Sequence, residues 1–377
     1  MSSKQQKRLF IIDGYATLYR AHYALIRNPL TNTAGTPTSA VFGFANQVFQ
    51  LIEDEKPDYL VAAFDSKGKN FRHELYTDYK ANRSAMPDEI QTQLPYLWEL
   101  LEAMNIPMLR VGGVEADDII GTVAKMCDKE NLQCNIVSGA KDFMQLINDK
   151  TFLYAPQARK RAKEVFNKKK VLEKWGVGPE HIIDLLGLMG DSSDNVPGVQ
   201  GVGPKTAKKL IQDFGSIESI YEEIDNISNE KMREKLLNSK ENALLSKQLV
   251  TILTDVNIEA TISDFEKKEM DLAKLEDIFK ELEFSGLLKK IGSNESVDIQ
   301  TVKREKKYEN LTDIDQLTSF VNSIKENEWL SVDLETTSVN PMIAEIVGFS
   351  FSVKKDTGVY VPIRFKDKID NLFGEDD

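Results

Sequence analysis

Short apolar runs that end at or near an aspartate alternate with helical patterns in the N-terminal part of the chain, and this alternation most constrains the fold. The apolar runs are residues 8–13, 58–65 and 134–138, and the helical patterns cover 39–55, 88–104 and 115–130. Strands that alternate with helices predict a mostly parallel sheet flanked by helices on both faces. We therefore expect an α/β domain over residues 1–175.

Acidic residues follow these runs or open a helix, namely Asp13, Asp65, Glu115, Asp117, Asp118, Asp142, Asp191 and Asp194. Ligands of such sheets bind beyond the carboxyl ends of the strands. Carboxylates gathered there would repel one another and raise their pKa values, unless cations lie between them. Magnesium takes oxygen ligands, and two ions roughly 4 Å apart can clamp a phosphodiester during in-line displacement. The pattern predicts a metal-dependent phosphodiesterase, and the alternative is a set of separate helix caps and turn residues.

The composition is that of a globular protein. The chain has 377 residues, with 41% hydrophobic and 29% charged residues, which favours two or three domains. No apolar stretch approaches the roughly 20 residues of a membrane helix, and the start lacks the apolar core of a secretion signal. Cys127 and Cys134 are expected to be reduced core thiols. We expect no membrane contact and a cytoplasmic location.

The net charge of −12 argues against nucleic acid only if the charges are evenly spread. Two segments are locally basic, residues 67–83 and 158–174. The first interleaves cations with Phe71, Tyr76 and Tyr79, and such rings stack on bases while cations follow the backbone of a single strand. It lies in a long irregular insertion, 66–95, which favours a function for this segment. Pro95 should mark the start of the next helix or kink it.

Residues 176–290 are mostly helical in pattern. Within them, 190–211 contains a glycine-rich hairpin followed by a helix that opens at Pro204. Backbone N–H groups at such a hairpin can hold a phosphate, and Lys205, Lys208 and Lys209 add positive charge. A nucleotide-binding glycine motif is excluded, because the preceding segment is helical in pattern rather than a strand.

The C-terminal part has a different character. Residues 292–312 are polar and resemble a linker, followed by a helix near 313–326. Three β runs, 328–340, 346–353 and 358–363, resemble a meander, and the chain ends in an acidic tail. Three strands cannot bury both faces of a sheet. We expect 306–377 to be a truncated piece that is disordered or loosely folded.

Residues 8–290 resemble the 5′-nuclease domain of the bacterial DNA polymerase I family, in the flap-endonuclease superfamily. The matching segments are IIDGYATLYRAHYAL, LTNTAGTPTSAVFGF, FDSKGKNFRHELYTDYKANR, GVEADDIIGT and LMGDSSDNVPGVQGVGPKTA. The resemblance implies a PIN-like α/β fold with a helical arch at about 67–95 and a helix–three-turn–helix DNA-binding subdomain over 176–291. Segment SVDLETTS resembles the first motif of the RNase H-like 3′–5′ exonuclease domain, truncated here over 313–377. Asp333 and Glu335 stand in its metal-binding places and are expected to be inert.

The resemblance implies roles for individual residues. Asp13, Asp65, Glu115 and Asp117 match ligands of a first Mg²⁺, with Asp118 beside them. Asp142, Asp191 and Asp194 match ligands of a second Mg²⁺, and Mn²⁺ would substitute in both sites. Lys80 and Arg83 match catalytic arch residues that hold the phosphate, and Arg72 and Tyr79 would stack or pair with the 5′ strand. The residues that match duplex-binding positions of the helix–three-turn–helix are Gly201, Gly203, Lys205, Thr206 and Lys208. Relatives also hold a K⁺ ion at this hairpin.

One position departs from the family pattern. Relatives have Asp where this chain has Ala140, so the second site lacks one carboxylate. Alanine offers no ligand atom. We therefore expect weakened second-metal binding and strongly reduced cleavage, with substrate binding largely intact. A natural loss and an engineered inactivation both fit, and the second is favoured.

The expected function is structure-specific 5′–3′ exonuclease and flap-endonuclease cleavage, the nuclease activity of a DNA-directed DNA polymerase, in replication and repair. The expected partners are 5′ flaps, nicks and RNA–DNA primer junctions, bound by a monomer through backbone contacts rather than base sequence. The alternative is a module that binds junction DNA without cutting it, which Ala140 favours. A PIN-type ribonuclease would share the acidic cluster but would not need the duplex-binding hairpin and helix of residues 190–211.

Overall fold

The computed structural model describes residues 6–155, 164–292, 307–325, 329–338, 342–354 and 357–363. It divides into two compact units, residues 1–295 and 296–377. Residues 158–163 of the second basic segment, 293–306 of the expected linker and the acidic tail lie outside the described residues.

The first unit is built on a six-stranded sheet of order β3-β2-β1-β4-β5-β6. The strands are β1 (Arg8–Asp13), β2 (Tyr59–Ala63), β3 (Met108–Leu109), β4 (Gln133–Val137), β5 (Thr151–Ala155) and β6 (Glu164–Phe166). All neighbouring pairs are parallel except β5–β6. The central strands β1 and β2 are buried along almost their whole length, as expected for a sheet covered on both faces. The predicted parallel α/β fold is confirmed.

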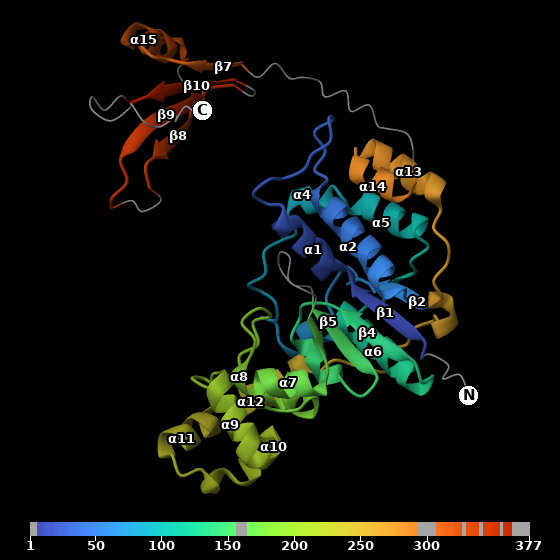
Figure 1. Cartoon of the computed structure of the whole chain (residues 1–377). Coiled ribbons are helices and arrows are strands. Elements are labelled where there is room, and N and C mark those ends of the chain that lie inside the picture. The colour runs from blue at the N-terminus through green and yellow to red at the C-terminus, as the bar shows by residue number, and fades with distance from the viewer. Residues whose placement is uncertain are drawn as a thin grey trace, which may run out of the picture. The chain divides into compact units, whose positions relative to one another are not determined.

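Helices connect and cover these strands (Figure 1). They are α1 (Gly14–Ala24), α2 (Ser39–Glu55), α3 (Phe71–Leu75), α4 (Asp88–Gln91), α5 (Leu94–Ala103), α6 (Ala116–Lys129) and α7 (Lys168–Trp175). Pro95 lies in the first turn of α5, where its missing N–H costs no helical hydrogen bond. The predicted pattern over 88–104 is therefore two helices, α4 and α5, rather than one.

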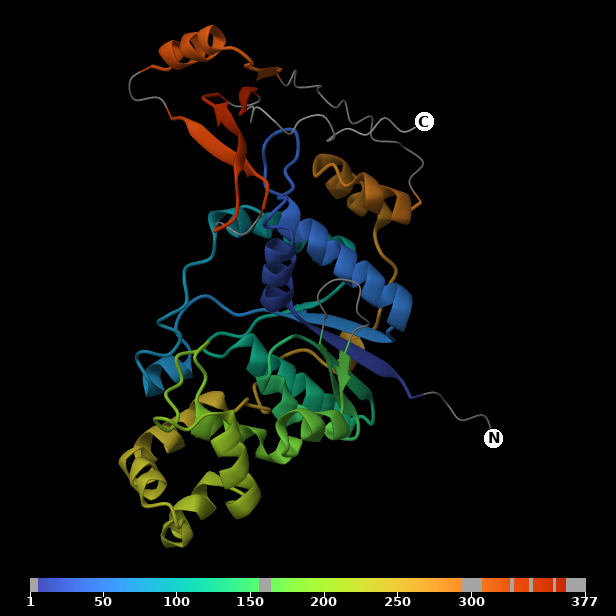
Figure 2. The same ribbon diagram turned by 60° about the vertical axis from the view of Figure 1, so that its left-hand side comes forward.

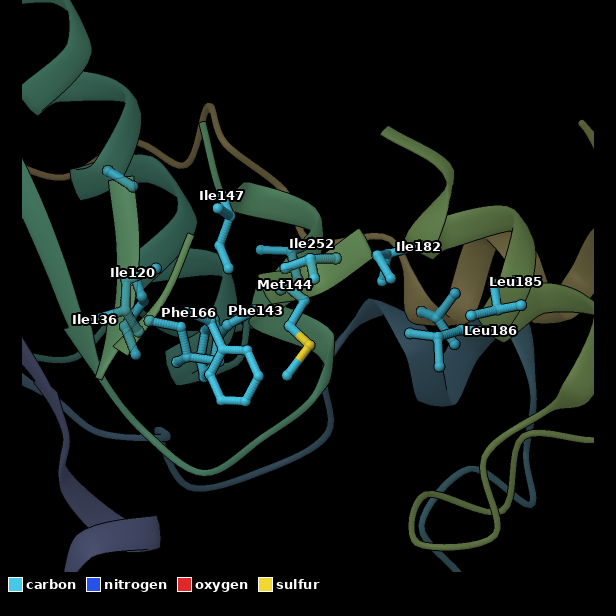
Figure 3. Close-up of a cluster of buried hydrophobic side chains, with 14 of the residues drawn as sticks. Ile120, Ile136, Phe143, Met144, Ile147, Phe166, Ile182, Leu185, Leu186 and Ile252 are labelled. Carbon is cyan, nitrogen blue, oxygen red and sulfur yellow. The ribbon is translucent and has the colours of Figure 1, made fainter. Parts of the chain in front are cut away.

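A second group of helices follows, and its yellow-green ribbons lie together in both views (Figure 2). It comprises α8 (Ile182–Met189), α9 (Pro204–Phe214), α10 (Ile217–Glu222), α11 (Glu230–Asn238) and α12 (Lys240–Val250). Ile182, Leu185 and Leu186 of α8 continue the buried cluster formed by sheet residues such as Ile136 (Figure 3). One apolar core thus holds the helical group against the sheet.

The helices α13 (Leu272–Glu281) and α14 (Ser285–Lys290) return to the α/β region. The ring of Phe279 lies 6.1 Å from that of Phe49 in α2, and the ring of Phe284 lies 5.1 Å from that of Phe42. Helix α13 also packs on α5. The last two helices of the predicted 176–291 subdomain therefore contact helices of the α/β region.

The second unit is a four-stranded sheet of order β7-β10-β9-β8 with one helix. Its elements are β7 (Lys307–Asn310), α15 (Ile314–Ser323), β8 (Ser331–Thr336), β9 (Ile346–Ser352) and β10 (Thr357–Pro362). Strands β8, β9 and β10 form the predicted antiparallel meander. Strand β7 pairs with β10 in parallel, so residues 307–310, expected in the linker, are a strand instead. Asp333 and Glu335 lie two residues apart on β8, which is exposed throughout.

Candidate functional site

The ends of β1 and β2 bring the first carboxylates to the edge of the sheet. Asp13 ends β1, caps α1 by accepting a hydrogen bond from the backbone N–H of Ala16 at 3.2 Å, and accepts another from the Ser138 hydroxyl at 2.7 Å. Asp65 follows β2 and accepts a 2.8 Å hydrogen bond from the backbone N–H of Ala116. Both acids therefore lie beside the N-terminus of α6.

The N-terminus of α6 supplies three more acids. Glu115 is the N-cap, and Asp117 and Asp118 lie in the first turn, where the helix dipole favours negative charge. The Glu115 side chain is 7% exposed and the Asp118 side chain is fully buried. Asp118 accepts a hydrogen bond from the backbone N–H of Glu115 at 3.1 Å, which closes a capping box.

A further group of acids comes from two separate segments. Asp142 begins a short 3₁₀ helix after β4, and Asp191 and Asp194 lie in the turn that follows α8. Asp191 accepts hydrogen bonds from the Ser193 backbone N–H at 3.0 Å and forms an ion pair with Lys141 at 3.1 Å. The packing of α8 on the 3₁₀ helix brings the two segments together.

One cavity receives side chains from both groups. Its lining includes Arg72, Tyr79, Glu115, Asp117, Asp142, Asp191 and Asp194. Burial raises the pKa of Asp117 well above its usual range, and the charge of Asp13 raises it further. Burial raises the pKa of Asp142 to about 7, with added contributions from Asp191 and Asp194. The acids expected from the sequence to converge thus lie close enough to repel one another.

The segment that follows α3 lies across these acids. Lys80 Nζ lies 2.5 Å from Glu115 Oε1 and 3.7 Å from Asp194 Oδ2, and Arg83 pairs with Asp194. The backbone N–H of Lys80 donates to the Asp194 carbonyl at 2.9 Å. The Tyr79 hydroxyl lies 3.1 Å from Glu115 Oε2 and 3.3 Å from Asp194 Oδ2. Lys80 and Arg83 therefore place positive charge beside Glu115 and Asp194, which line the acidic cavity.

Arg72 and Asp118 differ from their expected roles. Arg72 is 2% exposed and forms a bidentate pair with Asp118, with both N–O distances at 2.7 Å. Its guanidinium is therefore used inside the protein, and Asp118 also accepts hydrogen bonds from the backbone N–H groups of Glu115 and Leu253. Tyr79 is 4% exposed, so its ring is not open to stacking with a base in this structure.

The remaining acids fit a hydrated hard cation. Oδ1 of Asp142 is buried and has no hydrogen-bond partner among the described residues. Carboxylate oxygens are the donors that Mg²⁺ prefers, and Mg²⁺ usually keeps several of its waters. Within the described ranges, no three acidic, histidine or cysteine side chains are grouped tightly enough to enclose an ion by themselves. Water-mediated contacts would therefore complete the coordination.

Ala140 lies in the loop between β4 and Asp142. Its backbone N–H donates to the Ser138 hydroxyl at 3.2 Å, and that hydroxyl also binds Asp13. The methyl group is half-buried against the core. Position 140 therefore lies between Ser138, which binds Asp13, and Asp142, which belongs to the other acid group. The alanine side chain supplies no oxygen atom there.

The glycine-rich hairpin precedes α9 as predicted. Gly201 has a φ of +76°, which a side chain would strain, and Gly203 caps α9. Lys205 and Gly203 are exposed, while Thr206 and Lys208 are half-buried. The hairpin thus presents backbone and cations to solvent. In the second basic segment, by contrast, Lys168, Lys169 and Lys170 each form an ion pair with an acid.

Three residues near the acids were missed by the sequence analysis. Lys141 pairs with Asp191, and Asn70 donates to Glu115 Oε1 at 2.8 Å. Arg20 lies beside the Gly139 backbone, and its Nη1 is buried without a hydrogen-bond partner in the described part of the chain. Arg20 could have been found, because it stands two helical turns after Asp13 on the same face of α1.

Two family models match the first unit. Residues 8–176 match the 5′-3′ exonuclease N-terminal resolvase-like domain, and residues 177–273 match the 5′-3′ exonuclease C-terminal SAM fold. The chain is 40% identical over 285 residues to the 5′-3′ exonuclease of Aquifex aeolicus, which covers 76% of this chain and 95% of that protein. It is 43% identical over 290 residues to DNA polymerase I of Bacillus subtilis, covering 77% of this chain. That match spans only 33% of the polymerase.

The fold also matches a solved structure of a phage T5 flap endonuclease in a complex described as holding DNA and metal ions. The TM-score is 0.52 at 21% identity, and the match covers 76% of this chain and 100% of that one. At this identity the match establishes the shared fold. None of the described helices of the present chain combines the length and apolar character needed to cross a bilayer.

Proposed function

The chain belongs to the 5′-3′ exonuclease family found in bacterial DNA polymerase I, and from that premise we propose that it hydrolyses phosphodiesters near the 5′ ends of DNA strands at flaps and nicks. The observation that carries this proposal is the cavity lined by acids of both groups, two of which, Glu115 and Asp194, also form ion pairs with Lys80 and Arg83. The chain spans about a third of the polymerase relatives that it matches.

The acids would form two separate metal sites in this proposal. Asp13, Asp65, Glu115 and Asp117 would hold one Mg²⁺, and Asp142, Asp191 and Asp194 would hold the second. When bound, such ions activate a water and stabilise the attacking and leaving oxygens of an in-line displacement. Mn²⁺ has the same preference for oxygen ligands and would substitute.

The chain's own cations would act on the substrate phosphate. Lys80 and Arg83 come from a segment outside the sheet and pair with Glu115 and Asp194, so they would bind a phosphate that approaches these acids. A fixed positive charge placed where negative charge develops lowers the barrier of the reaction. The Tyr79 hydroxyl lies within hydrogen-bond distance of both Glu115 and Asp194 and so links the two acid groups.

The helical group would hold the duplex. Residues 200, 201 and 203–205, at the end of the hairpin and the start of α9, are exposed and include Lys205. Their backbone N–H groups would bind phosphates without reading bases. These features support DNA junctions, including RNA–DNA primer junctions, as the partner. A K⁺ ion at the hairpin, a cytoplasmic, nucleoid-associated location, a monomeric state and a division near residue 176 belong to the same proposal.

Ala140 favours a second candidate, a junction-binding module without cleavage. A 5′-flap duplex incubated with the protein and Mg²⁺ or Mn²⁺ distinguishes the two. Gel-shift binding together with a shortened 5′ strand supports the nuclease. Binding with no product over long incubation supports the module, and neither binding nor product contradicts both.

A further inference from the structure

Arg72 uses its whole guanidinium inside the protein. Nη1 and Nη2 donate to the two oxygens of Asp118, each at 2.7 Å. Nε donates to the Leu249 carbonyl at 2.8 Å, and Nη2 also donates to the Thr251 carbonyl at 2.7 Å. Arginine has five N–H donors in a rigid fork, so this set leaves little capacity for a substrate. Its partners come from α6 and from the end of α12.

Asp118 is equally engaged. Besides the two bonds from Arg72, it accepts hydrogen bonds from the backbone N–H groups of Glu115 at 3.1 Å and Leu253 at 2.9 Å. It is fully buried, so these four donors satisfy both of its oxygens. The pair therefore has the contacts of a structural element rather than those of a ligand site.

The pair reaches the acidic cavity through Glu115. Nη1 of Arg72 lies 3.4 Å from Glu115 Oε2, and Asn70, two residues before Arg72, donates to Glu115 Oε1 at 2.8 Å. Asn70 also caps α3 by accepting hydrogen bonds from the backbone N–H groups of Arg72 and His73. The start of α3 thus contacts both oxygens of the Glu115 carboxylate and restrains its orientation.

We propose that Arg72 is a positioning residue, which with Asp118 orients Glu115 for a divalent cation and ties α3 and the end of α12 to the acidic cavity. The inference rests on the proposed function, because it assigns Glu115 to a metal. It differs from a DNA-binding role, since Arg72 is 2% exposed and donates four hydrogen bonds to Asp118 and to the Leu249 and Thr251 carbonyls. It also differs from a purely stabilising role, because a buried ion pair contributes little net stability relative to apolar residues of similar size.

The test replaces both partners at once. Removing one partner would leave a buried charge and could unfold the protein, whereas Arg72→Met with Asp118→Leu removes both charges. Mg²⁺ and Mn²⁺ binding is measured by calorimetry without DNA, and melting temperature is measured in parallel. The double variant should remain folded and bind the ions about tenfold or more weakly, the usual effect of losing an outer-shell partner. Gel-shift affinity for a 5′-flap duplex in a chelator should be unchanged.

A matched control is the pair of Lys247 with Asp184, which lie 2.7 Å apart in the helical group. Its double replacement, Lys247→Met with Asp184→Leu, should leave ion binding as in the wild type. Wild-type ion affinity in a folded Arg72→Met/Asp118→Leu protein would overturn the proposal, as would an equal loss in the control. Arg72→Lys adds a second check, because it keeps the charge but not the fork, and it should also bind the ions weakly. A wild-type protein that binds no divalent ion would overturn the proposed function itself.

Discussion

The ammonium group of Lys80 lies 2.5 Å from Oε1 of Glu115 and 3.7 Å from Oδ2 of Asp194, so it bridges carboxylates that come from the two acid groups. Its backbone has a φ of +58° and donates to the Asp194 carbonyl. A divalent cation bound by Glu115 would therefore compete with this ammonium group for the same carboxylate oxygen. A substrate phosphate would offer Lys80 another partner.

Replacing Lys80 by Met should have opposite effects on metal binding and on cleavage. Divalent-ion affinity should rise several-fold, because a competing positive charge is removed from Glu115. Cleavage of a 5′ flap should fall about 100-fold or more, as when other preorganised charges are removed from a transition state. Calorimetry and a single-turnover assay measure the two quantities. Lys274→Met, which removes an exposed lysine paired with Glu102, is the control. Weaker ion binding in Lys80→Met would contradict the competition.

Replacing Ala140 by Asp should increase cleavage. The new carboxylate would stand in the loop that joins the Ser138 hydroxyl, bound to Asp13, with Asp142. We expect flap cleavage at least about tenfold faster, since each added oxygen ligand strengthens a magnesium site. Ala140→Asn introduces a side chain of the same size as aspartate but without its charge, and it should give a smaller gain in cleavage rate. A rate in Ala140→Asp equal to that of the starting protein would exclude impairment by alanine.

Asp142 should make stability depend on pH. Burial, with the charges of Asp191 and Asp194, raises the pKa of Asp142 to about 7, whereas an unfolded Asp titrates near 4. The folded protein therefore binds this proton more tightly. The resulting stability is complete below about pH 4 and is lost as the pH rises through about 7.

Asp142→Asn should accordingly raise the melting temperature by a few degrees at pH 8 in a chelator, and the gain should shrink as the pH is lowered to 5. Mg²⁺ should stabilise the wild type more than the variant. Asp149→Asn is the control, since the Asp149 side chain is 86% exposed and pairs with Lys168. An equal gain at pH 5 and pH 8 would show that the Asp142 charge does not weaken the fold.

The sequence analysis located the sheet and the acids well because both follow from local patterns. Strand β1 and helix α2 have their predicted bounds, since apolar runs and helical spacing are properties of contiguous residues. Arg72 was misassigned because its surroundings in the sequence are basic and aromatic. Its partners, Asp118 and the Leu249 and Thr251 carbonyls, lie 46 to 179 residues away.

The return of α13 and α14 to the α/β region was missed for a related reason. Their apolar faces predict that each helix has one buried side, but the pattern does not identify the elements that cover it. Strand β7 was missed because residues 307–310 are exposed and polar, so that only pairing with β10 defines them as a strand.

Lys205 provides a test of the helical group that is independent of the metals. It is exposed in the first turn of α9, beside the N-cap Gly203, and no ion pair engages it in the described part of the chain. If it contacts a duplex phosphate, Lys205→Ala should weaken flap binding and reduce the slope of log affinity against log salt concentration by about 0.9. The single-turnover cleavage rate at saturating DNA should stay unchanged, because Lys205 lies on α9, whereas Asp191 and Asp194 lie in the turn that follows α8. Lys169→Ala, which removes a lysine paired with Glu173, is the control and should leave the slope as it is. An unchanged slope in Lys205→Ala would remove the start of α9 from the DNA interface, whatever the state of the acidic cavity.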